Sequence, residues 1–177
     1  MLKVILISLL MLGGSPESSL AQTTKCGSAT LPPKLQSQLA EHFNGWKVVD
    51  VSDLSAEDQE VWSESFAGKC PGYVEGNFTG RPSIAMTMIR YKGANLYQML
   101  IVAEPRVRGY NIETLSGAEM AAVPDVVLKT SPRKYFNAER DHHVTIKFDG
   151  IVYTKLEAAA TLYYFLNGKF RHLEISE

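Results

Sequence analysis

Two apolar segments separated by a short turn constrain the fold of this chain more than any other feature. Ser83 to Tyr91 alternates between two faces that both carry apolar side chains, and Leu96 to Ala103 is apolar almost throughout. Such a continuous apolar strand is typical of a central strand that is covered on both faces. We therefore expect an antiparallel pair at the centre of the core, with Pro105 ending its second strand.

Weaker strand patterns flank this pair. Tyr73 to Phe78 precedes it, while Tyr110 to Leu115 and Val126 to Lys129 follow it. We expect Ser116 to Pro124 to form a loop or a helical turn. Thr130 to Glu139 contains a proline and many polar groups, which predicts a long exposed loop.

The last third of the chain predicts two β-hairpins. Val144, Ile146 and Phe148 alternate with polar residues before Asp149-Gly150, a dipeptide that favours a two-residue type I′ turn. This turn would pair Phe148 with Ile151 and Ile146 with Tyr153.

The second hairpin turns at Asn167-Gly168 and joins Thr161–Leu166 to Lys169–Ser176. Its register places Leu162 opposite Leu173 and Ala160 opposite Ile175 on one face. Phe165 then meets Phe170 and Tyr163 meets His172 on the other face. Because both faces carry apolar side chains, we expect both to be at least partly covered.

Two helices are predicted before the strands. Pro32-Pro33 suits a first helical turn, and Leu35, Leu39 and Phe43 recur every four residues. Ser55 is expected to cap a second helix that ends at Gly68. Helices followed by a run of strands indicate an α+β fold, here two N-terminal helices packed on a mostly antiparallel sheet of about six to eight strands.

The first 21 residues have the pattern of a signal peptide. Lys3 precedes an apolar run from Val4 to Leu12, and Ser19-Leu20-Ala21 fits a cleavage site. We expect residues 22–177 to form one globular domain that is exported to the periplasm or the extracellular space. The formal net charge of −1 argues against a nucleic-acid partner, and no later apolar run is long enough for an integral membrane protein.

Cys26 and Cys70, the only cysteines, are expected to form a disulfide in an oxidising compartment. Closing a loop of this length would contribute about 4 kcal/mol on the chain-entropy model. The two cysteines lack the spacing of a zinc site, and no phosphate-binding glycine motif follows a strand, so we expect no metal and no cofactor.

The segment Glu75-Gly76-Asn77-Phe78-Thr79-Gly80-Arg81-Pro82-Ser83-Ile84-Ala85 resembles a degenerate FG-GAP/VCBS-like motif, a strand–turn–strand unit that often holds calcium. Asn77, Thr79 and Ser83 stand where that motif has acidic or ligating residues, so the resemblance does not imply calcium binding here.

The chain is also similar to a loose group of uncharacterised exported bacterial proteins. The similarity lies in Cys70-Pro71-Gly72, in Leu162-Tyr163-Tyr164 and in the segment from Gly168-Lys169-Phe170-Arg171 to Ile175-Ser176. This resemblance implies export and the fold, and it implies no activity.

Asp141-His142-His143 is the cluster that comes nearest to a catalytic or metal site. On a strand, Asp141 and His143 would share one face, while His142 would lie on the other, opposite Glu157. We favour the interpretation that these are polar residues at a strand end, with a cross-strand ion pair between His142 and Glu157 at the surface, since no third ligand is evident. No catalytic residue is assigned.

The hypothesis that best fits the sequence is an exported, non-enzymatic binding or structural domain. Its partner would be an unidentified protein or envelope component, bound through a sheet face or through Thr130 to Glu139. One alternative is an envelope hydrolase or metal-dependent enzyme that uses Asp141 and His143. Another is an inhibitor of a secreted enzyme, with Glu104 to Gly109 as its binding loop.

Overall fold

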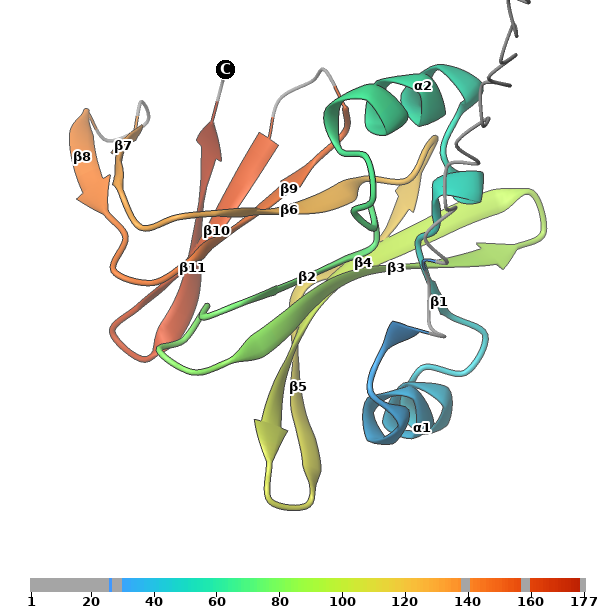
Figure 1. The fold of residues 1–177 in the computed structure, drawn as a ribbon, viewed down its shortest axis with the longest axis horizontal. Coiled ribbons are helices and arrows are strands. Elements are labelled where there is room, and N and C mark those ends of the chain that lie inside the picture. The colour runs from blue at the N-terminus through green and yellow to red at the C-terminus, as the bar shows by residue number, and fades with distance from the viewer. Residues whose placement is uncertain (1–25, 27–29, 138–140, 157–159, 176–177) are drawn as a thin grey trace, which may run out of the picture.

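The computed structural model describes residue 26 and residues 30–137, 141–156 and 160–175, which adopt an α+β fold (Figure 1). Within these residues the strands form antiparallel sheets of five, four and two strands, so the expected single sheet of six to eight strands is not found. The elements, in chain order, are α1 (Pro33–His42), β1 (Lys47–Val48), the 3-10 helix η2 (Val51–Asp53), α2 (Ala56–Ser65), β2 (Tyr73–Gly76), β3 (Ser83–Lys92), β4 (Asn95–Arg106), β5 (Gly109–Ala121), β6 (Val126–Thr130), β7 (Lys134–Asn137), β8 (His142–Thr145), β9 (Gly150–Thr154), β10 (Ala160–Leu166) and β11 (Lys169–Ile175).

The predicted central pair is confirmed as β3 and β4. Strand β4 lies between β3 and β5 in the five-stranded sheet, whose order is β1-β3-β4-β5, and β2 also pairs with β3. Met86 pairs with Ile101, and Ala85 pairs with Val102. All four side chains are buried, which is the burial expected for a strand pair covered on both faces.

Different partners cover the two faces of this pair. On one face, Leu35 and Leu39 of α1 pack against the methionines and isoleucines of β3 and β4. On the other, the four-stranded sheet, of order β11-β10-β9-β6, supplies Val127, Ile151 and Tyr153. The result is two packed sheets with α1 outside one of them (Figure 1).

Two smaller elements close the remaining apolar surfaces. Trp62 of α2 packs with Leu54, Ile89 and Val126 at one end of the core. The β7–β8 hairpin covers the outer face of the four-stranded sheet, where Tyr135 joins a cluster with the buried leucines of β10 and β11. Residues 130–137, the described part of the predicted exposed loop, are therefore not a long exposed loop, since β7 forms there and buries Tyr135.

Two further expectations are wrong in the same region of the five-stranded sheet. Strand β4 continues to Arg106, so Pro105 does not end it; Pro105 pairs with Tyr110. Strand β5 continues to Ala121, although the segment from Ser116 was expected to leave the sheet. Pairing between β4 and β5 holds both extensions: Pro105 pairs with Tyr110 beside the turn, and Ala121 pairs with Leu96 at the other end. Local strand propensity does not show this pairing.

The prediction of a hairpin at Asp149-Gly150 is also wrong. Strand β8 pairs with β7, while β9 pairs with β6 and β10. Neither Asp149 nor Gly150 has the positive φ that a type I′ turn requires. Instead, the Asp149 carboxylate accepts a hydrogen bond from the Asn77 backbone N–H at 2.8 Å. A Cβ on Gly150 would lie 2.7 Å from a Leu162 methyl carbon, so this glycine permits close packing rather than a turn.

The Asn167-Gly168 hairpin is confirmed, together with its register. Both turn residues have positive φ, at 52° and 82°, as a type I′ turn requires. Leu162 pairs with Leu173 and Tyr163 pairs with His172, as predicted. The two faces of this hairpin contribute to separate apolar clusters, so both are covered.

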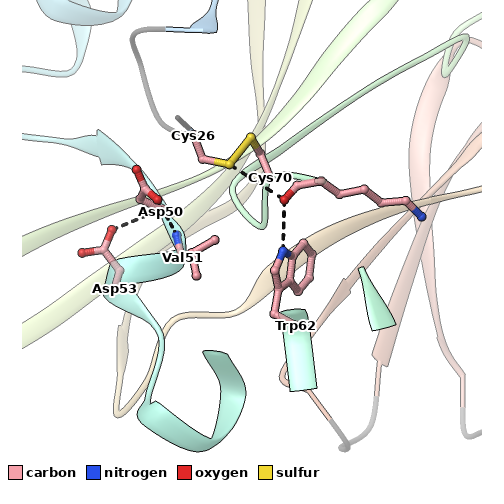
Figure 2. The surroundings of a disulfide bond; sticks show 7 residues. Cys26, Asp50, Val51, Asp53, Trp62 and Cys70 are labelled. Carbon is pink, nitrogen blue, oxygen red and sulfur yellow. Dashed lines mark hydrogen bonds between the residues drawn. A yellow bond between two sulfur atoms is a disulfide. The ribbon is translucent and has the colours of Figure 1, made fainter. Parts of the chain in front are cut away.

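The disulfide between Cys26 and Cys70 is present (Figure 2). Close to it, the buried Trp62 indole N–H donates to the Lys69 carbonyl at 3.0 Å. The neighbouring Asp50 carboxylate accepts from the Val51 backbone N–H and so begins η2. The disulfide therefore links residue 26 to the segment between α2 and β2.

Gly72, two residues after the disulfide, should tolerate no side chain. A Cβ there would lie 2.1 Å from the Val49 carbonyl oxygen, and that backbone cannot move aside because the Val49 N–H is bonded to the Thr87 carbonyl. We predict that Gly72→Ala lowers the free energy of unfolding by about 2–3 kcal/mol, measured by chemical denaturation. Gly117→Ala is the matched control, because a Cβ at Gly117 meets nothing within 4 Å. Equal effects of the two substitutions would contradict the prediction.

Candidate functional site

The residues of the predicted polar cluster lie at the start of β8 and do not form a metal site. Asp141 is exposed in the turn, with a φ of 48°, while His143 is exposed on β8 and its ring meets the edge of the Phe136 ring at 5.4 Å. His142 pairs with Asn137, and its expected partner Glu157 lies outside the described residues. Within those residues, no group of three or more His, Cys, Asp or Glu side chains could hold a metal ion.

The segment that resembles an FG-GAP/VCBS-like motif forms β2, a turn and the start of β3. Its polar groups are engaged in structural contacts with other parts of the chain. The Asn77 backbone is bonded to Asp149, and the Thr79 hydroxyl donates to Glu104 at 3.0 Å.

The segment Glu104 to Gly109 forms the turn between β4 and β5, which projects at the bottom of Figure 1. Val107 at its tip is 98% exposed. The Gln38 side chain of α1 braces the hairpin by accepting from the Tyr110 N–H at 2.6 Å and donating to the Tyr110 carbonyl at 3.2 Å. The projecting turn is thus rigidly supported from the helix side.

A polar hollow between β5 and the four-stranded sheet contains the described ionisable groups whose pKa values are shifted. We call it the Asp125 cleft, and its volume is about 660 Å³. It is lined by Leu115, Ser116, Gly117, Glu119, Asp125, Tyr153, Thr154, Lys155, Thr161, Tyr163, His172 and Glu174.

Asp125 is fixed by the side chain of Gln98, which is buried in β4. The Asp125 backbone N–H donates to Gln98 Oε1 at 2.9 Å, and Gln98 Nε2 donates to Asp125 Oδ2. Gln98 thus bonds both the backbone and the carboxylate of Asp125. This pair of bonds holds the carboxylate at one orientation where the chain enters β6.

Three further oxygens are buried beside this pair. They are Asp125 Oδ1, the Tyr153 hydroxyl and the Thr87 hydroxyl. Tyr153 is only 9% exposed, and it lines the cleft together with Asp125. Its hydroxyl interacts through hydrogen bonding with both Asp125 and Thr87, so the three oxygens form one buried polar group beside the cleft.

Burial sets the ionisation of these groups. It raises the pKa of the Asp125 carboxyl, although the hydrogen bond from Gln98 and the charge of Lys155 oppose the shift. Burial, and then the charge of Asp125, raise the pKa of the Tyr153 phenol, so this hydroxyl keeps its proton at physiological pH. Burial also raises the pKa of Tyr163.

Two further carboxylates line the cleft and are held by neighbouring hydroxyls. Ser116 donates to Glu119 at 3.1 Å, and Thr161 donates to Glu174 at 2.9 Å. With Asp125, the cleft lining has three carboxylates and one lysine, so its charge is negative overall. The arrangement can attract a cation and surround it with oxygen acceptors and tyrosine rings.

Irregularities in β5 bring its side chains to the cleft. The pairing of β4 with β5 shifts register twice, between Gln98 and Leu100 and again between Leu100 and Ile101. These shifts place extra residues in β5 where Leu115, Ser116 and Gly117 line the cleft. Bulges of this kind commonly redirect side chains next to functional sites.

The sequence reasoning missed this site, although two local signals could have indicated it. Gln98 is a polar residue inside an otherwise apolar central strand, where a buried amide needs hydrogen-bond partners. Gly117 interrupts a strand pattern, which is typical of a bulge. The partner Asp125 is distant in sequence and could not be assigned from either signal.

Comparisons of the chain with protein-family models, with curated proteins and with solved structures gave no match. Among the helices within the described residues, none has both the length and the apolar character needed to cross a membrane.

We predict that Asp125→Asn raises the free energy of unfolding at pH 7, because burial penalises a carboxylate more than an amide. A carboxyl whose pKa is raised by folding binds its proton more tightly in the folded protein. Stability therefore falls as pH rises from below about 3.9, the ordinary Asp value, through the raised folded pKa. The advantage of the variant should grow over this interval and be small below it, as measured by denaturation from pH 3 to pH 8.

The exposed substitution Glu113→Gln is the control and should show no comparable pH-dependent gain. A variant at position 125 that is less stable than the original protein throughout the pH range would contradict the assigned effect of burial.

Proposed function

We propose that this protein is an exported, non-enzymatic binding domain whose Asp125 cleft takes a small organic cation, such as a primary amine. The observation that carries the proposal is a cleft whose lining brings the carboxylate oxygens of Glu119, Asp125 and Glu174 together with the hydroxyls of Tyr153 and Tyr163. An ammonium group has three N–H donors and no acceptor, so it complements these oxygens.

The size and lining of the cleft support this ligand class. A volume of about 660 Å³ falls within the range of small-molecule sites. Tyr153 and Tyr163 meet edge to face, with ring centroids 6.5 Å apart, and both line the cleft. Aromatic rings beside carboxylates attract organic cations through the ring quadrupole as well as through charge.

The ionisation of the cleft favours binding over catalysis. Asp125 is held by two hydrogen bonds with Gln98: its carboxylate accepts one from Gln98 Nε2, and its backbone N–H donates the other to Gln98 Oε1. These bonds fix the position of the carboxylate. The raised pKa of Tyr153 keeps its hydroxyl neutral, so it is a hydrogen-bonding group rather than a base. These groups suit recognition of a ligand that does not react.

Export is supported by the disulfide between Cys26 and Cys70, because structural disulfides persist mainly in oxidising compartments. On this proposal residues 1–21 are the signal segment, and the binding domain acts in the periplasm or outside the cell. The amine that binds in the cleft would then be a small molecule of that compartment.

We predict that n-pentylamine binds in the cleft and that n-pentanol does not, because only the amine brings a positive charge to the carboxylates. An NMR titration should show shifts at Tyr153 and Tyr163 for the amine alone. Glu174→Gln should weaken amine binding at least about tenfold, since it removes one of the three carboxylate charges that line the cleft.

Glu113→Gln is the matched control, because Glu113 lies on β5 outside the cleft lining. Equal binding of the alcohol, or an equal loss of affinity in the control variant, would overturn the proposal.

A further inference from the structure

A second hollow, of about 680 Å³, lies between the β7–β8 hairpin and the β10–β11 hairpin. All four residues of β8, His142 to Thr145, line it, and so do three consecutive residues of β11, Phe170 to His172. Neighbouring side chains of a strand point to opposite faces, so a hollow lined by consecutive residues faces the edge of the strand. We call this hollow the edge groove.

Strand β11 is the last strand of its sheet, so one of its edges is open. In a two-residue hairpin the residues that flank the turn, here Leu166 and Lys169, exchange backbone hydrogen bonds. Hydrogen-bonded and non-hydrogen-bonded pairs alternate from there. The backbone groups of Phe170, His172 and Glu174 therefore point away from β10.

Among the described residues, strand β8 pairs with β7 alone, so its other edge is open there too. The Ile146 N–H donates to the Arg133 carbonyl at 3.0 Å, which fixes the alternation along this ladder. His143 and Thr145 therefore direct their backbone groups away from β7. Two open strand edges thus border one groove.

The β7–β8 hairpin is anchored firmly enough to keep this groove formed. The buried Tyr135 of β7 packs with Leu162 and Leu173, and its hydroxyl is 2.7 Å from the Thr130 hydroxyl. The Arg133 guanidinium lies over the Tyr135 ring, 4.6 Å from its centroid. A ligand would therefore meet preformed edges, which lowers the entropy lost on binding.

Apart from Tyr164, the ionisable side chains that line the edge groove are basic. Arg171, His142, His143 and His172 contribute a guanidinium and three imidazoles, and none of the lining residues is acidic. Guanidinium groups bind carboxylates in a bidentate geometry, and imidazole N–H groups donate to them. The lining thus complements a carboxylate-bearing ligand, in contrast to the Asp125 cleft.

We propose that the edge groove binds an extended peptide segment with acidic side chains, which adds as a strand to β11. Main-chain hydrogen bonds to its open edge would supply affinity, as in other cases of strand addition, and the basic lining would select acidic side chains. This site is separate from the small-molecule site, although His172 lines both hollows.

The test uses the full folded protein and an acetylated, amidated peptide of seven residues that alternates valine with glutamate. Fluorescence anisotropy should show saturable binding, and hydrogen exchange should slow at the amides of Phe170, His172 and Glu174. A peptide with lysine in place of glutamate should bind at least about tenfold more weakly. The glutamate peptide with N-methyl groups on alternate amides should also bind about tenfold more weakly, because it keeps the charge but cannot form the hydrogen bonds to the strand edge.

Two variants separate backbone pairing from side-chain contact. His172→Pro removes an outward N–H, while His172→Ala keeps that N–H and removes the ring, so the proline variant should bind the peptide more weakly than the alanine variant. If the proline variant does not fold, the comparison of the methylated and unmethylated peptides with the original protein shows whether binding depends on backbone hydrogen bonds. Absence of binding by the glutamate peptide, or equal binding of the N-methylated peptide, overturns the proposal and leaves the basic edge as a device against aggregation.

Discussion

Burial of β4 on both faces is the constraint on which the rest of the structure depends. Leu100 and Ile101 are adjacent in sequence, point to opposite faces and are both fully buried. A strand of this kind is stable only when separate apolar layers cover it. Helix α1 provides one layer, and the sheet that contains β9 provides the other. Loss of either layer would expose one face of the central strand pair.

The same strand carries the polar residue that defines the Asp125 cleft. Gln98 interrupts the apolar run of β4, and its two hydrogen bonds to Asp125 hold the chain at the point where it enters the second sheet. This contact ties the two sheets together beside the bulged part of β5. The candidate binding site therefore depends on the same hydrogen bonds that hold Asp125 in place, with Tyr153 buried beside it.

The two hollows offer opposite chemistry on neighbouring parts of one sheet. Carboxylates line the Asp125 cleft, whereas the edge groove is lined by an arginine and three histidines and by no acidic residue. Strand β11 borders both, because its side chains alternate between faces while its outer edge remains unpaired. The C-terminal hairpin thus has a central place in both binding proposals, and Asn167-Gly168 fixes the register that makes this possible.

The sequence by itself determined the features that depend on neighbouring residues. The Asn167-Gly168 hairpin, the Leu35–Leu39 stripe and the apolar β3–β4 pair follow from turn chemistry and periodicity. Only the tertiary structure decided which strands pair across long separations. Asp149-Gly150 has the composition of a turn, but its glycine is needed for contact with Leu162 and its aspartate bonds to Asn77. The Asp125 cleft likewise depends on residues from β4, β5 and β9, whose proximity results from sheet packing rather than local preference.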